Sequence, residues 1–265
     1  MMKRWHKLLS LTLSLVLAAS LAACGGRSGG TELAVFAAAS MQETLTEIGE
    51  AYMKEHPDIT LTFSFDSSGT LKTQIEEGAV CDVFISAGQS QMDGLEAGGY
   101  ILSGSRFDLL ENKVALAVPE GNLARVMSYG DLRERLEAGG GILLAMGNSD
   151  VPVGQYTQKI FAYFGLDEAA LNTAGVLTYG SNVKEVTTQV SEGTVDCGII
   201  YGTDAFSAGL TVVDTAAKEM CGQVIYPAAV LSGSGHPDEA RAFMDYVRSP
   251  AGAAVLKSVG FTPLE

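Results

Sequence analysis

Small hydroxyl residues and exposed backbone stand directly before several expected helices, and this is the clearest chemical pattern in the sequence. Ser40 follows one apolar run and opens a helix, and Ser68 does the same after the next run. The segments 150–154 and 180–183 open two later helices. A helix N-terminus presents unpaired N–H groups and about half a positive charge. Several termini that converge on one point would bind an anion without any lysine or arginine.

Each of these residues also has a purely structural interpretation. A serine before a helix is usually an N-cap, worth about 1 kcal/mol, and Ser67 and Gly69 are typical turn residues. The residues alone therefore leave open whether Ser40 and Ser68 bind a ligand or only cap helices. The combination of several such loops is what favours an anion site.

Motifs for catalysis are missing from the sequence. No Gly-x-Ser-x-Gly elbow stands between an expected strand and an expected helix, and there is no His-Glu-x-x-His, phosphate-loop lysine or Gly-x-Gly-x-x-Gly. Besides His6 in the N-terminal segment, the histidines are His56 and His236, and both precede Pro-Asp in turn-like settings. A serine hydrolase that used Ser40 or Ser68 would lack an evident base. We therefore expect a binding protein without a cofactor rather than an enzyme.

Composition and charge narrow the class of protein further. The chain has 265 residues, a formal net charge of -14, 47% hydrophobic residues and 8% aromatic residues. These values indicate a globular protein of one large or two medium domains. Nucleic-acid phosphates would repel so acidic a chain, which excludes nucleic acid as the main partner. The acidity favours solubility rather than recognition.

The N-terminal segment has the features of a bacterial export signal. Its basic start (Lys3, Arg4 and Lys7) is followed by an apolar stretch, 8–19, that is too short to span a bilayer stably. Leu21-Ala22-Ala23-Cys24 resembles the lipoprotein cleavage box. We expect removal of 1–23, a lipid on Cys24, a flexible tether over 24–30 and an extracytoplasmic, membrane-anchored protein. An ordinary signal peptide that leaves Cys24 free is the alternative.

The remaining cysteines do not form an obvious disulfide framework. Cys81, Cys197 and Cys221 are odd in number, so they cannot all pair. Cys81 and Cys197 lie in strand-like runs, which favours buried free thiols, although a disulfide stays possible. No histidine or cysteine stands near them at metal-ligand spacing.

Apolar runs alternate with amphipathic segments along the rest of the chain. The pattern is strand, loop, helix, as in 33–36 followed by 41–55, and it predicts an α/β fold with mostly parallel sheets flanked by helices. Two such sets lie before and after residue 112, and a final strand and two helices follow. We expect two lobes, one from 31–111 with 229–265 and the other from 112–228.

The loop sequences resemble those of the molybdate-binding proteins of bacterial ABC importers. The matching strings follow the family order through nearly all of 31–265: Val35-Phe36-Ala37-Ala38-Ala39-Ser40, Phe65-Asp66-Ser67-Ser68-Gly69-Thr70-Leu71, Asp82-Val83-Phe84-Ile85-Ser86-Ala87, Val151-Pro152-Val153-Gly154, Tyr201-Gly202-Thr203-Asp204-Ala205, Tyr226-Pro227 and Gly260-Phe261-Thr262. The resemblance implies a two-lobed type II periplasmic binding protein fold with the ligand in the cleft between the lobes. It also implies a monomer whose partners are an ABC permease and its ATPase.

In that family two serines, two main-chain N–H groups and a tyrosine hydroxyl hold the oxyanion, and molybdenum is bound only through its oxygens. The matching positions are Ser40 and Ser68 for the serines, Val153 and Val183 for the main-chain donors, and Tyr201 for the tyrosine. Asp66 departs from the pattern, because relatives often have alanine there. A carboxylate that pointed at a dianion would repel it, so we expect Asp66 to face away and cap the helix.

Other ligands compete with molybdate. Tungstate has the same charge and size, and the smaller sulfate is excluded only if the cavity is large enough. A ferric-iron binder of related fold would carry adjacent tyrosines, whereas Tyr179, Tyr201 and Tyr226 have no tyrosine neighbour. A fully deprotonated oxyanion offers only acceptors, so donors alone satisfy it, whereas hydrogen phosphate would leave its own donor unpaired.

Overall fold

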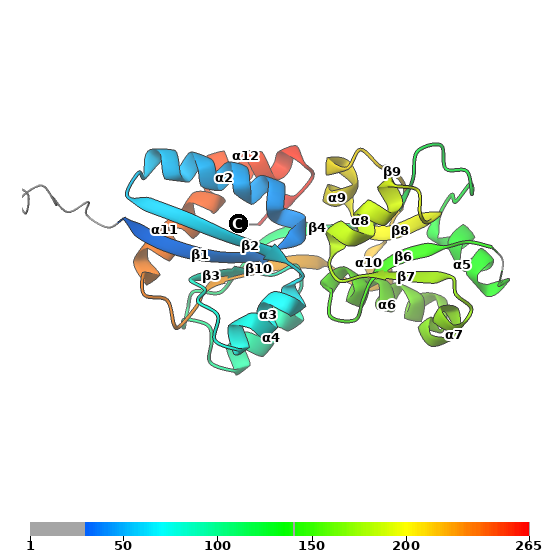
Figure 1. Cartoon of the computed structure of the whole chain (residues 1–265), viewed down its shortest axis with the longest axis horizontal. Coiled ribbons are helices and arrows are strands. Elements are labelled where there is room, and N and C mark those ends of the chain that lie inside the picture. Colours follow the sequence, from blue (N-terminus) through cyan, green and yellow to red (C-terminus); the bar gives the residue numbers. More distant parts are fainter. Residues whose placement is uncertain (1–29, 140, 265) are drawn as a thin grey trace, which may run out of the picture.

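The alternating sequence pattern folds into two helix-flanked sheets that lie side by side (Figure 1). The computed structural model describes residues 30–139 and 141–264. The expected export signal, Cys24 and the tether up to residue 29 lie outside the described residues. Within the described part of the chain, no helix is long and apolar enough to cross a membrane.

The first lobe is built on a six-stranded sheet of order β11-β4-β10-β3-β1-β2. Its strands are β1 (Thr31–Ala38), β2 (Ile59–Asp66), β3 (Val83–Ile85), β4 (Phe107–Asn112), β10 (Val224–Val230) and β11 (Thr262–Pro263). Its helices are η1 (Ala39–Met41), α2 (Gln42–Glu55), α3 (Ser68–Glu76), α4 (Gln89–Ala97), α11 (Pro237–Arg248) and α12 (Pro250–Ser258). Leu33, Val35 and Ala37 of β1 are completely buried, as expected for an internal parallel strand.

The second lobe is built on a five-stranded sheet of order β7-β6-β8-β5-β9. Its strands are β5 (Val114–Val118), β6 (Leu144–Gly147), β7 (Leu177–Gly180), β8 (Cys197–Tyr201) and β9 (Thr211–Thr215). Its helices are α5 (Tyr129–Glu137), α6 (Pro152–Phe164), α7 (Glu168–Thr173), α8 (Val183–Ser191), α9 (Gly202–Ser207) and α10 (Lys218–Cys221).

The chain crosses between the lobes twice before it ends. The first crossing runs from β4 through Lys113 into β5, close to the change of lobe expected at 112. The return lies ahead of β10, which starts at Val224 and belongs to the six-stranded sheet. This strand is therefore part of the first lobe's sheet, although the sequence suggested a return at 229.

The two-lobed α/β fold is confirmed, but the expectation of mostly parallel sheets is wrong. The pairs β1–β2, β1–β3, β6–β7 and β6–β8 are parallel. Every pair that includes β4, β5 or β10 is antiparallel. These three strands lie next to the crossings between the lobes. Parallel pairing needs a crossover connection within one sheet, and these strands are not joined to their partners in that way. Both sheets are therefore mixed.

The parallel strands position the loops that carried the chemical pattern. In each lobe, the residues at and just after the carboxyl ends of these strands face the junction between the lobes. Ligands of open α/β sheets bind at this edge, because the helices that follow begin there.

The three described cysteines are free and buried, as the sequence favoured. Burial raises the pKa of Cys81 to about 12 and that of Cys197 to about 12. Thiols with such pKa values stay protonated, so these side chains act as small apolar groups.

Candidate functional site

A small pocket lies at the junction of the two lobes. It is lined by the first-lobe residues Ala38, Ala39, Ser40, Asp66, Ser67, Ser68 and Ala87 and the second-lobe residues Val151, Pro152, Val183 and Tyr201. None of these lining residues is a lysine, arginine or histidine. An anion in this pocket would therefore meet neutral hydrogen-bond donors.

The pocket brings together most of the residues that the resemblance assigned to the ligand. Ser40, Ser68, Val183 and Tyr201 all line it. Val153 does not, but it directly follows the lining residue Pro152, and its side chain is completely buried. Any contribution from Val153 would come from its backbone N–H, which is the group the resemblance implied.

Both main-chain donors lie in the first turn of a helix. The helix expected from Gln155 already begins at Pro152, because proline is well suited to the first helical position. The helix expected from Lys184 begins at Val183 and is capped by Asn182, whose side chain accepts from the N–H of Glu185. N–H groups in a first turn have no acceptor within their helix. Within the described chain, those of Val153 and Val183 donate to no other group.

Ser68 is not a helix cap in the structure. Ser67 caps α3 instead, because its Oγ accepts from the N–H of Thr70 at 3.1 Å. The Oγ of Ser68 accepts from the N–H of Ala87 at 2.9 Å. A hydroxyl has a single proton, and that of Ser68 is left to point into the pocket.

Ser40 does not cap a helix either. It lies in η1, and neither η1 nor α2 has a side-chain hydrogen bond at its N-cap. Its Oγ lies 2.9 Å from Oη of Tyr226, a completely buried residue of β10. Helix capping, the role that the sequence left open for both serines, is thereby excluded.

Tyr201, the last residue of β8, presents a buried hydroxyl to the pocket. Its Oη is among the few buried polar atoms of the described chain that have no hydrogen-bond partner. Such a hydroxyl costs about 1–3 kcal/mol, and an acceptor atom in the pocket would offset this cost. Burial also holds the pKa of Tyr201 well above its usual value, so the phenol stays a donor.

The pocket has one tyrosine neighbour beyond its lining. The rings of Tyr201 and Tyr226 lie 5.7 Å apart, so two tyrosines do meet in space although they are not adjacent in sequence. Burial keeps the pKa of both phenols well above the usual value, so both hydroxyls stay protonated. Among the described residues, no group of three histidine, cysteine or acidic side chains could hold a metal ion.

Asp66 has a different role from the one expected. The prediction that it caps the following helix is wrong, because Ser67 is the cap. The Oδ1 of Asp66 accepts from the N–H of Ser67 at 2.7 Å and from the amide of Asn182 at 3.2 Å. Asp66 thus joins the first lobe to the second at the edge of the pocket, where it is the single acidic lining residue.

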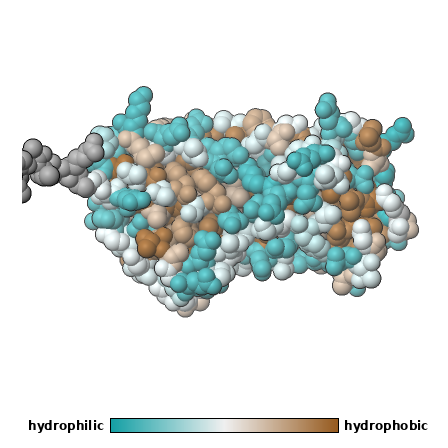
Figure 2. All heavy atoms as spheres, viewed as in Figure 1, coloured by the Kyte–Doolittle hydropathy of each residue, from teal (hydrophilic) through white to brown (hydrophobic). Residues whose placement is uncertain are grey.

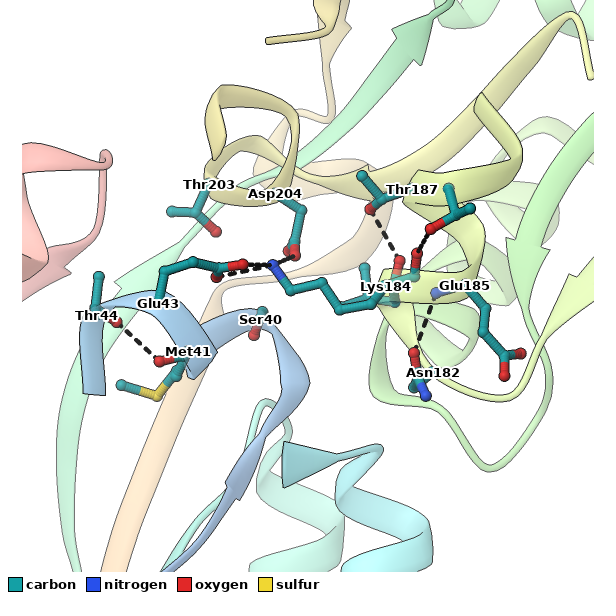
Figure 3. A network of polar contacts seen from close by, with 12 residues as sticks. Ser40, Met41, Glu43, Thr44, Asn182, Lys184, Glu185, Thr187, Thr203 and Asp204 are labelled. Atoms are coloured by element: carbon teal, nitrogen blue, oxygen red, sulfur yellow. Dashed lines mark hydrogen bonds and ion pairs between the residues drawn. The ribbon is translucent and has the colours of Figure 1, made fainter. Parts of the chain in front are cut away.

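An ion pair also joins the lobes beside the pocket. Figure 3 shows Lys184 of α8 reaching to Glu43 of α2 and to Asp204 of α9. The Nζ of Lys184 lies 2.8 Å from both carboxylate oxygens of Glu43 and 3.2 Å from Oδ1 of Asp204. Burial raises the pKa of Asp204 to about 6, against the lowering effect of Lys184. Lys184 is therefore paired with two carboxylates, and it is not among the residues that line the pocket.

Further contacts join the two lobes. On the opposite side of the pocket, Ser90 and Gln91 of α4 bond to the side chain of Gln155 on α6. A methyl group at Gly69 would overlap the carbonyl oxygen of Asp150 in the other lobe. Hydrophilic side chains gather over the junction on the face in Figure 2.

Most of the residues that surround the pocket were not predictable from their own sequence segments. Asn112, Lys184 and Glu43 carry no local signal, since each acts through a partner distant in the chain. Asp204 stood in one of the matching strings, but only the structure shows its pairing with Lys184. Tyr226 stood in one of the matching strings, but only the structure shows its contact with Ser40.

Comparison with known families identifies the family of the chain. A family described as bacterial extracellular solute-binding proteins matches residues 33–262, which is most of the chain. The chain belongs to this family.

Two curated relatives cover almost the full length. The molybdate-binding protein ModA of Mycobacterium tuberculosis is 32% identical, over 97% of this chain and 98% of its own. A putative ABC transporter substrate-binding lipoprotein of Bacillus subtilis, YvgL, is 31% identical, over 91% of this chain and 92% of its own. A more distant relative from a Pseudomonas species, 25% identical over 88% of both chains, is named aconitate isomerase.

A solved structure supports the fold. The periplasmic molybdate-binding protein of Azotobacter vinelandii superimposes with a TM-score of 0.77 at 22% identity, covering 88% of this chain and 100% of that chain. At this identity the likeness confirms the two-lobed architecture.

Proposed function

We propose that the protein binds molybdate outside the cytoplasm and delivers it to the permease and ATPase of an ABC importer. The observation that carries this proposal is the donor set of the pocket: the hydroxyls of Ser40, Ser68 and Tyr201 and the helix N-termini at Val153 and Val183. An oxyanion without protons offers only acceptors, so every donor is satisfied. The name of the Mycobacterium tuberculosis relative supports molybdate as that oxyanion.

The donors come from both lobes, so the bound anion would hold the lobes together. Ser40 and Ser68 belong to the first lobe, and Val153, Val183 and Tyr201 belong to the second. A ligand that bridges two lobes favours the closed form over the open one. We infer that a permease reads this closed form, and that the protein acts as a monomer without a cofactor. The lipoprotein name of the Bacillus subtilis relative supports a lipid anchor on Cys24.

Catalysis is not part of the proposed function. Ser40 bonds to Tyr226 and Ser68 accepts from Ala87, so neither serine faces a base that could activate it. We expect no ester hydrolysis, and no isomerisation of aconitate despite the name of the distant Pseudomonas relative.

Isothermal titration calorimetry with molybdate, tungstate, sulfate and phosphate tests the proposal. We expect molybdate and tungstate to bind alike and the other two anions to bind far more weakly. At about 1,000 times its dissociation constant, molybdate should raise the free energy of unfolding by about 4 kcal/mol. Equal affinities for molybdate and sulfate would contradict the molybdate assignment.

Phosphate binding needs a control of its own, because the carboxylate of Asp66 in the pocket lining could accept the proton of hydrogen phosphate. The Asp66→Asn variant keeps an oxygen for the N–H of Ser67 and removes the charge from the pocket. We expect this variant to bind molybdate at least as well as the wild type, since a repulsion is lost. Phosphate binding that is tight in the wild type and lost in Asp66→Asn would instead identify a site for a protonated anion.

Glu43→Gln should weaken molybdate binding slightly. The ion pair with Lys184 joins the two lobes, but the Glu43 side chain is 51% exposed, so its contribution is small. We expect a dissociation constant about 2- to 5-fold higher at low salt and little difference at high salt. Glu47→Gln, an exposed residue of the same helix, is the matched control. A difference that persists at high salt would show that Glu43 acts by something other than this ion pair.

A further inference from the structure

A hydrogen-bonded series of buried side chains leads from the first crossing between the lobes to Ser40. Asn112, at the end of β4, donates through Nδ2 to the Thr203 hydroxyl at 2.9 Å and to the Tyr226 hydroxyl at 3.2 Å. Tyr226 Oη lies 2.9 Å from Ser40 Oγ. All four side chains are buried, so bulk water does not supply other partners.

The direction of these hydrogen bonds follows from Asn112, at which the series of buried side chains begins. The backbone N–H of Lys113 donates to Oδ1 of Asn112 at 2.8 Å, and an N–H cannot accept. The amide oxygen of Asn112 therefore faces Lys113, and its NH₂ group faces Thr203 and Tyr226. Tyr226 accepts from Asn112, which leaves its single proton for Ser40.

The opposite direction would leave a buried proton without a partner. If Ser40 donated to Tyr226, the Tyr226 oxygen would accept twice and its own proton would have no other acceptor within hydrogen-bond distance, since the nearby Tyr201 hydroxyl makes no hydrogen bond. A buried hydroxyl in that state has lost water without replacing it. Ser40 therefore accepts from Tyr226 and has its only proton free for the pocket that it lines.

We propose that Asn112 and Tyr226 are positioning residues that make Ser40 a hydrogen-bond donor to the ligand, and that they thereby select oxyanions without a proton. The inference rests on the proposed function, because it concerns the selectivity of the same pocket. A deprotonated oxyanion gives the Ser40 proton an acceptor. The proton of hydrogen phosphate finds no acceptor at Ser40, whose oxygen is already engaged by Tyr226.

Tyr226→Phe tests this relay of hydrogen bonds from Asn112 through Tyr226 to Ser40, because it removes the Tyr226 oxygen and keeps the ring. Ser40 is then free to donate or accept, so molybdate affinity should fall about 3- to 10-fold. The ratio of molybdate affinity to hydrogen phosphate affinity should fall with it. Calorimetric titration gives the first value, and competition of phosphate against bound molybdate gives the second. Tyr129→Phe is the matched control, since it removes a buried hydroxyl that does not line the pocket.

Asn112→Asp reverses the relay with almost no change of shape. The new carboxylate accepts the proton of Tyr226, Tyr226 then accepts from Ser40, and Ser40 presents only its lone pairs to the pocket. Molybdate affinity should fall further than in Tyr226→Phe. It should partly recover as the pH falls and the carboxylate becomes protonated, whereas Tyr226→Phe should show no such recovery.

The outcomes separate the relay from the function on which it rests. A wild-type protein that does not bind molybdate would remove the proposed function itself. Wild-type binding together with an unchanged affinity and ratio in Tyr226→Phe would overturn the relay. Equal losses for molybdate and phosphate, without pH recovery in Asn112→Asp, would overturn it as well, because Tyr226 would then only support packing. Thermal unfolding of each ligand-free variant verifies that it folds.

Discussion

Replacing Val183 with proline should abolish molybdate binding while the protein remains folded. Val183 is the first residue of α8, where proline is favoured, and Asn182 before it is extended with φ -152° and ψ 172°. The substitution removes one N–H donor and places ring carbons where a ligand oxygen would sit. Loss of a hydrogen bond to a charged ligand alone costs about 1.5–3 kcal/mol. Calorimetry should therefore detect a weakening of about 100-fold or more.

Glu168→Pro is the matched control for this substitution. Glu168 is the first residue of α7, and the residue before it, Asp167, is extended with φ -97° and ψ 106°. The control makes the same backbone change at a helix that does not reach the pocket. It should bind molybdate like the wild type. If Val183→Pro also binds within a few-fold of the wild type, the N-terminus of α8 does not contact the ligand.

Ser68→Ala should weaken molybdate binding by about 1–3 kcal/mol, or roughly 5- to 150-fold. The ligand loses one hydroxyl donor in a site where no water replaces it, because Ser68 is completely buried. The N–H of Ala87 also loses its acceptor, so the free energy of unfolding without ligand should fall. Both quantities can be measured on the same sample, by calorimetry and by denaturant unfolding.

Ser67→Ala separates the two effects. Ser67 lies next to Ser68 in the same loop, but its hydroxyl caps α3, and losing such a cap costs about 1 kcal/mol of stability. We expect Ser67→Ala to lose stability with little loss of affinity. If Ser68→Ala shows the same profile as Ser67→Ala, then Ser68 only supports the loop and does not bind the anion.

The elements that the sequence predicted well are those with local signals. The apolar run at 33–36 lies within β1, and His56-Pro57-Asp58 follows the end of α2 at Glu55. The helix α4 was missed, because only Gln91, Met92 and Leu95 of its residues are buried and its apolar periodicity is weak. The antiparallel pairing of β10 was missed for another reason: strand direction depends on how the chain crosses between the lobes, not on the strand's own residues.

In the pocket too, residues with a local sequence signal were predictable, and their partners from distant segments were not. Ser40, Ser68, Val183 and Tyr201 stand at strand ends or helix starts, which the sequence marks, and their loops converge as expected. The partners that orient or surround them were not predictable. Ser40 contacts Tyr226 across 186 residues, and Lys184 contacts Glu43 across 141 residues. The first pair forms only when β10 joins the first lobe's sheet, and the second forms only when the two lobes pack together, so neither residue's own segment indicates them.

A crystal structure of the molybdate complex is the most direct test of anion binding by neutral donors. The anomalous scattering of molybdenum should locate the ion between the lobes. Its oxygens should lie within hydrogen-bond distance of the hydroxyls of Ser40, Ser68 and Tyr201 and of the N–H groups of Val153 and Val183. A molybdenum peak at another place, or a lysine or arginine in contact with the anion, would contradict the proposed site.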